Sequence, residues 1–252
     1  MEEQLSTLTQ AQRLCVGVLR SSSKEPFPEH YYLRFAWCSP GEPFDAKSAQ
    51  KVMKKFDRRL LALSVGHFER FFLRRAMYPI PGLRARSGAD VLYMNPSRLF
   101  PKRDSVTFMV DHLTYMMGCM LEREHTLAYG ICIVADFSDF TMANFTVQFF
   151  HRMLLVLQGR LVPTRVEAFL IVNPPPWFGN IWAVMKPMMS TEFMAKVPRI
   201  SFNDLGKHLM PGYEQLLPND IWMGRRDAKS LMDLFIQERK HIERARMAAN
   251  KR

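Results

Sequence analysis

Two short segments of this 252-residue chain consist almost entirely of apolar residues, YGICIVADF at 129–137 and VEAFLIVN at 166–173. Their lengths and their valine and isoleucine content are typical of strands buried on both faces. The segment between them, MANFTVQFFHRMLLVLQG at 142–159, is apolar nearly all round and ends on a glycine, as a buried helix does. This order of strand, helix and strand predicts parallel strands joined by a right-handed crossover.

The preceding residues extend the same pattern toward the amino end. In ADVLYMN, Val91 and Tyr93 alternate with their neighbours as in a strand. The next segment, 104–122, has apolar residues at helical spacing, with Asp104 or Ser105 as its N-cap. The fold is therefore predicted to be α/β, with a mostly parallel sheet and flanking helices.

The segment after the last of these strands has very little polar surface. A short helix is expected at about 176–189, and its apolar sides need cover. The cover is either the protein core or, if the helix is a lid, a ligand and a membrane, and the aromatic and methionine content favours a lid. The residues assigned to this lid and to membrane contact are Trp177, Phe178, Ile181, Trp182, Met185, Lys186, Met188 and Met189.

The formal charge of +11 predicts attraction to an anionic surface, either phospholipid headgroups or nucleic acid. A basic amphipathic helix is expected at 46–63, but its basic and aromatic residues are not interleaved as a stacking platform requires, which argues against nucleic acid. No segment approaches the roughly 20 apolar residues of a membrane-spanning helix. The acidic first residues do not resemble a secretory signal. We therefore expect a cytoplasmic protein that associates peripherally with membranes.

Residues that could carry catalysis are few. Asp136 and Asp139 follow a predicted strand, where α/β folds often place reactive groups. No histidine or third carboxylate lies at ligand spacing from them, and the common nucleotide-binding and hydrolase motifs do not occur. The sequence therefore predicts no enzyme, no cofactor and no metal, with a hydrolase acting through these aspartates as the weaker alternative. The cysteines have no metal-ligand spacing and are expected to be reduced core thiols: Cys15, Cys38, Cys119 and Cys132.

Four segments resemble, in their order and spacing, the CRAL-TRIO lipid-binding family, which includes phosphatidylinositol and α-tocopherol transfer proteins. They are LRF with FDAKSA, YGICIVADFSDFTMANF, VEAFLIVNPPPWF and WAVMKPMMS. The most specific match is Asn173-Pro174 followed by Lys186-Pro187, where the family has an Asn-Pro turn and the end of its gate helix. The resemblance implies a helical amino-terminal subdomain and a β-sheet floor under a deep apolar pocket, closed by a mobile gate helix.

The expected organisation has four parts: a mobile lead-in at 1–28, a helical subdomain at 29–75, the lipid-binding domain at 76–224 and a basic carboxyl-terminal helix at 225–252. On the last helix, Leu231, Leu234, Phe235 and Ile242 are expected to share one side. This side predicts a terminal helix that docks on the domain.

The family resemblance implies one hydrophobic ligand of the phospholipid, sterol, tocopherol or retinoid class. Apolar residues of the sheet and the helices that face it are the expected lining: Cys132, Val134, Phe140, Phe145, Phe149, Met153, Phe169 and Ile171. Lys196 and Arg199 are the expected headgroup contacts. In members that hold phosphatidylinositol a carboxylate pairs with the lysine, but Thr164 occupies the carboxylate position here, which argues against this headgroup mode and leaves a less polar ligand open.

A second function remains open on the sequence alone. Domains of this family also occur fused to phosphatases and regulators of small GTPases, where recruitment matters more than transport. The chain is therefore either a lipid-exchange domain or a protein-interaction or membrane-recruitment module of the same fold, with a protein partner that the sequence does not identify.

Overall fold

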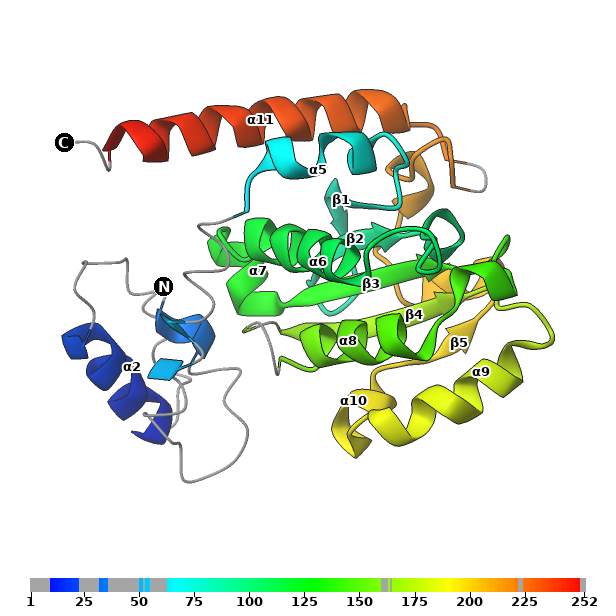
Figure 1. Cartoon of the computed structure of the whole chain (residues 1–252), viewed down its shortest axis with the longest axis horizontal. Helices are drawn as coiled ribbons and strands as arrows, with labels where there is room; N and C mark the ends of the chain where they lie inside the picture. The colour runs from blue at the N-terminus through cyan, green and yellow to red at the C-terminus, as the bar shows by residue number, and fades with distance from the viewer. Residues whose placement is uncertain are drawn as a thin grey trace.

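The computed structural model describes residues 10–22, 32–35, 50–51, 53–54, 63–159, 163, 165–221 and 224–249. Its centre is a five-stranded sheet in the order β1-β2-β3-β4-β5 (Figure 1). The strands are β1 (Met77–Arg84), β2 (Asp90–Met94), β3 (Ile131–Asp136), β4 (Val166–Val172) and β5 (Arg199–Ile200). β1 pairs antiparallel with β2, and each later pair is parallel. The predicted α/β fold with a mostly parallel sheet is confirmed.

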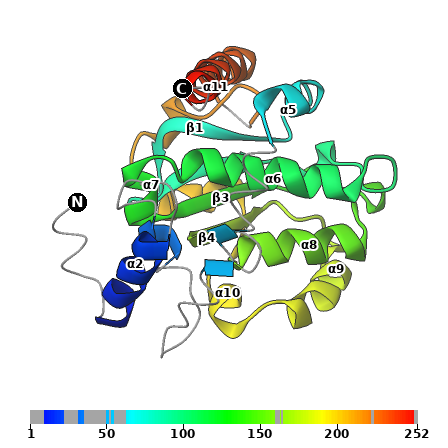
Figure 2. The ribbon, with the colours of Figure 1, turned by 60° about the vertical axis from the view of Figure 1, so that its left-hand side comes forward.

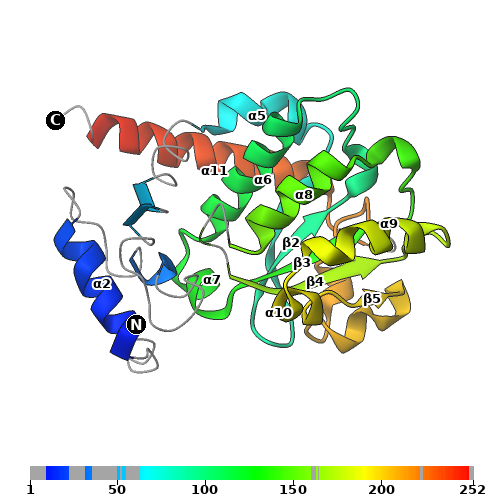
Figure 3. The same ribbon diagram turned by 60° about the horizontal axis from the view of Figure 1, so that its bottom comes forward.

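The connections between the parallel strands contain five α-helices, of which α7 (Glu124–Tyr129) and α10 (Thr191–Ala195) are short. The three longer ones lie on one face of the sheet: α6 (Val106–Met120), α8 (Val147–Leu157) and α9 (Phe178–Met185). Because each connection leads to the next strand in the same direction, right-handed crossovers place all three on the same side. Figures 1 and 2 show α6 and α8 side by side in front of the strands, and Figure 3 shows α9 next to α8.

The other face of the sheet is covered by the chain after β5. This stretch contains the 3₁₀ helices η4 (Phe202–Lys207) and η5 (Tyr213–Gln215). It buries Leu205, Leu209 and Leu217, and Leu209 forms a β-bridge with Ala85.

Side-chain caps define where α6 and α8 begin. Ser105 caps α6, since its hydroxyl accepts a hydrogen bond from the N–H of Phe108. The predicted helix at 142–159 begins later than expected, because Thr146 caps α8 and residues 142–144 form a separate 3₁₀ turn, η2. Gly159, with φ 72°, follows the end of α8 as predicted.

Two further helices pack against each other beyond β1, α5 (Val65–Phe72) and α11 (Ala228–Ala249). The buried side of α11 is formed by Ala228, Met232, Phe235 and Arg239. The expectation that Leu234 shares this side is wrong, because Leu234 is exposed. The buried side of α11 instead contains Arg239, which a search for apolar residues does not find.

The amino-terminal predictions fall only partly on described residues. Residues 10–22, inside the expected mobile lead-in, form α2 (Gln10–Ser22), which buries Cys15, Val16 and Leu19, so a mobile lead-in does not describe this stretch. Residues 32–35 are helical, as are 50–51 and 53–54 of the expected basic helix. Leu63, the last residue of that expected helix, is not helical, and the rest of its range lies outside the described residues. The boundaries of the four expected parts stay a prediction.

Three of the four cysteines are described, and they are buried as expected. Cys15, Cys119 and Cys132 are buried free thiols, and burial raises the pKa of each to about 12, while Cys38 lies outside the described residues. Within the described part of the chain, no helix has the length and apolar character needed to cross a membrane.

Candidate functional site

The register of the sheet divides the residues that were expected to line one pocket. Side chains on a strand alternate between faces, and directly paired residues of parallel strands point to the same face. Phe169 pairs with Ile133 on β3, and Val134 pairs with Leu170 on β4. Phe169 and Ile171 therefore share one face, whereas Cys132 and Val134 point to the other, so the eight residues cannot line a single cavity.

An aromatic cluster identifies the face that α9 covers. Phe137 continues the alternation of Ile133 beyond β3, and its ring lies 5.0 Å from that of Phe178 on α9. Phe169 and Ile171 thus face the helices. Cys132 and Val134 face the segment after β5. The pocket prediction is kept for the residues on the helix side and withdrawn for these two.

The remaining lining residues come from α8 and the loop before it, and they form a continuous apolar layer. Phe140 contacts Phe150 of α8 and stacks on Trp177 with ring centroids 5.9 Å apart. Phe145 and Phe149 both contact Phe150, at 5.1 and 5.6 Å. Met153 is buried on the same helix. This layer lies between the sheet and the start of α9.

The helix α9 presents two different sides. Phe178, Ile181 and Met185 are buried, which is the spacing of one helical face. The other side exposes Gly179, Asn180, Ala183 and Val184, and the helix contains no charged residue. The residues assigned to the lid therefore divide into an inner group and a more accessible group that consists of Trp177, Trp182, Lys186 and Met188, while Met189 is buried.

The two cationic residues assigned to a headgroup both have partners within the protein. The guanidinium of Arg199 lies 5.1 Å from the ring centroid of Trp182 on α9. The Nζ of Lys196 lies 3.2 Å from a carboxylate oxygen of Glu192, one helical turn earlier. Lys196 is thus already paired with a carboxylate, and Thr164 lies outside the described residues.

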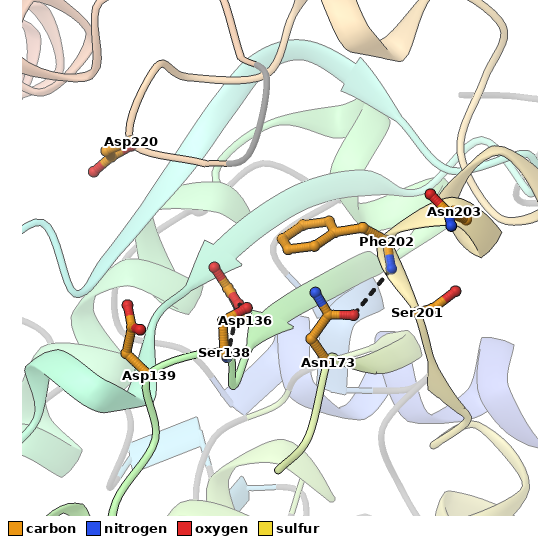
Figure 4. Close-up of a pocket in the computed structure, with 8 residues that line it drawn as sticks. All are labelled: Asp136, Ser138, Asp139, Asn173, Ser201, Phe202, Asn203 and Asp220. Carbon is orange, nitrogen blue, oxygen red and sulfur yellow. Dashed lines mark hydrogen bonds between the residues drawn. The ribbon is translucent and has the colours of Figure 1, made fainter.

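A polar pocket of about 460 Å³ opens at the carboxyl ends of β3 and β4. Figure 4 shows the residues that line it: Asp136, Ser138, Asp139, Asn173, Ser201, Phe202, Asn203 and Asp220. The carboxylate of Asp136 accepts hydrogen bonds from the N–H and O–H of Ser138, at 3.0 and 2.6 Å. The O–H of Tyr93 donates to its other oxygen at 3.4 Å. Asp136 is therefore engaged in holding the turn after β3.

The second buried carboxylate of this pocket, Asp220, is neutralised from the sheet side. It accepts hydrogen bonds from the O–H of Tyr78 at 2.6 Å and from Arg98 at 2.7 Å, and Arg75 lies 3.7 Å away. Burial and the neighbouring Asp220 raise the pKa of Tyr78. Sequence reasoning missed Asp220, because its partners are more than 100 residues away along the chain and no local pattern marks it.

The geometry therefore gives little support to hydrolysis through Asp136 and Asp139. Asp139 is exposed, and Asp136 is committed to the Ser138 turn. Among the described residues, no group of three histidines, cysteines or carboxylates is arranged to hold a metal ion. The apolar layer beneath α9 is the other candidate site, and its side chains can contact only a hydrophobic ligand.

Comparison with known proteins agrees with this reading of the fold. A model of the CRAL/TRIO domain matches residues 78–213, which is more than half of the chain. The chain is 28% identical over 105 residues to an alpha-tocopherol transfer protein-like protein of Mus musculus, covering 40% of this chain and 30% of that protein. It is 20% identical over 132 residues to the tyrosine-protein phosphatase non-receptor type 9 of the same species, covering 52% of this chain and 22% of the phosphatase. The chain thus spans less than a third of the length of these relatives.

The fold extends over nearly the whole chain in a solved structure. The crystal structure of Sfh5 superposes with a TM-score of 0.59 and 13% sequence identity, covering 96% of this chain and 98% of that one. At this identity the similarity establishes the fold alone. Together with the match of the domain model, it shows that the chain belongs to the CRAL/TRIO domain family, a family of lipid-binding domains.

Proposed function

We propose that this chain binds one hydrophobic lipid between the helix-covered face of the sheet and α9, and that it exchanges the lipid at a membrane surface when α9 moves outward. The observation that carries the proposal is the two-sided character of α9. Its inner residues Phe178, Ile181 and Met185 join the apolar layer, while its outer side is uncharged and partly apolar. The apolar residues of such a helix are buried against the protein in the closed domain and against lipid in a bilayer interface.

The energetics explain why exchange belongs at a membrane. Burial of apolar area gains about 25 cal/mol per Å², so a lipid of several hundred Å² gains on the order of 10 kcal/mol relative to water. Release into water would forfeit that gain, whereas release into a bilayer forfeits little. The net charge of +11 supports attraction to an anionic bilayer.

The ligand class is the second part of the proposal. Lys196 already pairs with Glu192, and Arg199 lies against Trp182, so neither supports a strongly charged headgroup. We favour a weakly polar lipid of the sterol, tocopherol, retinoid or acyl type over a phosphoinositide. Native mass spectrometry of the purified protein, followed by solvent extraction and lipid identification, tests this choice. Stoichiometric recovery of a phosphoinositide would refute it.

A matched pair of substitutions tests the role of α9. Val184 is 42% exposed on the outer side of α9, and Val147 is 48% exposed at the start of α8. Val184→Asp places a charge that has to be dehydrated when the helix enters a bilayer, and we expect at least a tenfold loss of lipid transfer between liposomes (~2 kcal/mol or more for a buried aspartate). Val147→Asp should retain transfer, because aspartate is favourable in a first helical turn. Equal transfer by the two variants contradicts the proposal.

A recruitment module is the second candidate function. It is favoured by the phosphatase relative, in which the matched region amounts to only 22% of the protein and is therefore one part of a larger chain. An apo mass after gentle purification, with no uptake from mixed liposomes, would support recruitment and would make α9 an ordinary packed helix. We propose no catalytic activity for the domain itself.

A further inference from the structure

The segment that carries α9 is fastened at its far end by the side-chain amide of Gln158. Gln158, the C-cap residue of α8, lies against the backbone that follows η3 (Lys186–Met188). Its Oε1 accepts a hydrogen bond from the N–H of Ser190 at 2.8 Å, and its Nε2 donates to the carbonyl oxygen of Met188 at 3.1 Å. One side chain thus forms the pair of bonds that a neighbouring strand would form.

At the near end, the segment leaves the sheet at Asn173. This residue has φ 47°, in the left-handed region that asparagine tolerates better than most residues. Its N–H donates to the carbonyl oxygen of Ile200 at 2.9 Å, and its Oδ1 accepts from the N–H of Phe202 at 3.1 Å (Figure 4). The first bond holds Asn173 to the end of β5, and the second holds it to the chain that follows β5.

The residues between these two points are joined to the protein mainly by apolar contacts. Three consecutive prolines at 174–176 follow Asn173 and form a stiff arm that leads to α9. The inner contacts of α9 are non-directional and are replaced without loss by lipid chains. The hydrogen bonds at the two ends are directional, and hydrocarbon cannot replace them.

We infer that Gln158 is a latch and Asn173 a pivot for the segment 174–189, which turns outward when the two Gln158 bonds to Met188 and Ser190 break. The inference rests on the proposed function, because the open segment is the route by which the lipid leaves. Both are positioning residues, since neither is placed in the apolar layer that holds the ligand. The latch sets how often the segment opens, and the proline arm carries α9 with it.

The first test removes the latch. Gln158→Met keeps the length of the side chain and loses both bonds to the segment, together with the 3.2 Å bond from Nε2 to the carbonyl oxygen of Leu154 within α8. We expect the amides of α9 to exchange with deuterium roughly tenfold faster, and a bound lipid to leave faster by a similar factor. Gln148→Met is the matched control, because Gln148 is exposed on the same helix. The two variants should unfold at similar denaturant concentrations.

A second variant distinguishes a latch from a merely structural residue. In Gln158→Glu the carboxylate still accepts from the N–H of Ser190 but cannot donate to the carbonyl oxygen of Met188. A protonated carboxyl group does donate. As the pH falls toward the ordinary glutamate pKa of about 4.3, α9 exchange in this variant should therefore slow relative to the wild type, after correction for intrinsic rates.

The pivot is tested by replacing only its side-chain bond. Asn173→Asp keeps an acceptor for the N–H of Phe202, and Asn173→Gly keeps the positive φ but removes the acceptor. We expect wild-type exchange of α9 in the first variant and about threefold faster exchange in the second.

The outcomes separate the latch from the proposed function. If the α9 amides exchange and the lipid leaves at the same rates in Gln158→Met as in Gln148→Met, the latch is refuted. Lipid binding by both variants would still support the proposed function. If no variant and no wild-type protein holds a lipid, the proposed function fails. Faster α9 exchange in Gln158→Met would still support the latch in that case.

Discussion

The helices α9 and α11 both pack on the outside of the domain, but opposite kinds of contact hold them. α9 contains no charged residue and is held by apolar side chains on one side. α11 is held by a charged seam in which Arg239 forms two hydrogen bonds with Glu122, at 2.6 and 3.2 Å, and Arg246 forms a third with Glu122 at 2.9 Å. The two helices are therefore expected to differ in how readily they detach.

The seam beneath α11 extends to the start of α5. The carboxylate of Glu243 accepts hydrogen bonds from the O–H of Tyr115 at 2.7 Å and from the backbone N–H of Val65 at 3.1 Å. The terminal helix thus supplies an acceptor to the first turn of α5. Buried charges are costly to separate, so contacts of this kind fix a helix, whereas apolar contacts let α9 exchange one apolar environment for another.

The largest effect is expected where the charged seam is most buried. Arg239 is 5% exposed, and Arg239→Ala leaves Glu122 with the exposed Arg246 as its remaining cation. We expect a loss of about 3 kcal/mol in the free energy of unfolding, measured with urea. Lys240→Ala is the control, because its pair with Glu69 is largely exposed, and such pairs contribute ~0–1 kcal/mol. Similar losses in both variants would remove the contrast between α9 and α11.

Hydrophobic pattern alone was enough to predict the parts of the fold that are repeated and fully buried. The strands β3 and β4 and the helices α6 and α8 follow from their apolar spacing. β1 was missed because Pro79 and Pro81 argue against a strand, yet an antiparallel strand at the edge of a sheet tolerates proline, since its outer side needs no ladder hydrogen bond.

The candidate site was predictable only in part, for a physical reason. The sequence marks residues as apolar but does not give the pairing register, and a shift of one residue moves a side chain to the other face. The expected lining therefore mixed Phe169 with Cys132, which point to opposite faces. The Gln158 bonds and the Asp220 network join residues that are far apart along the chain, and no local pattern indicates them.

Acidification should act on the α5–α6 side of the molecule and leave α9 in place. His112 is fully buried on α6 among the rings of Phe68, Phe71 and Phe72, whose centroids lie 5.0–5.2 Å away. Within the described residues its ring nitrogens have no hydrogen-bond partner, and burial lowers the pKa of His112 from 6.5 to about 3. The unfolded chain therefore binds a proton that the folded chain excludes.

The sign of the effect follows from this lowered pKa. The neutral His112 side chain makes its full contribution to the free energy of unfolding above pH 6.5, the pKa of histidine in the unfolded chain. This contribution is lost as the pH falls toward about 3, the pKa of His112 in the folded protein. In that window His112 should reduce the free energy of unfolding by about 1.4 kcal/mol per pH unit. Urea unfolding at several pH values should show a shallower slope for His112→Leu, with the exposed His151→Leu as control. Identical slopes in all three proteins would mean that His112 takes up its proton without unfolding.

The smallest expected effect concerns a cation–π contact on α9. The guanidinium of Arg199 covers the ring of Trp182, and at an exposed site such a contact contributes about 0.5 kcal/mol. Arg199→Ala should therefore release lipid to acceptor liposomes about twofold faster and leave the urea midpoint nearly unchanged. Arg199→Lys keeps the charge but not the planar stacking, so its rate of lipid release should lie between those of the wild type and Arg199→Ala. If Arg199→Ala instead slowed transfer while Arg199→Lys did not, the arginine would act by attracting the anionic bilayer, and α9 would be held by its apolar face and the Gln158 latch alone.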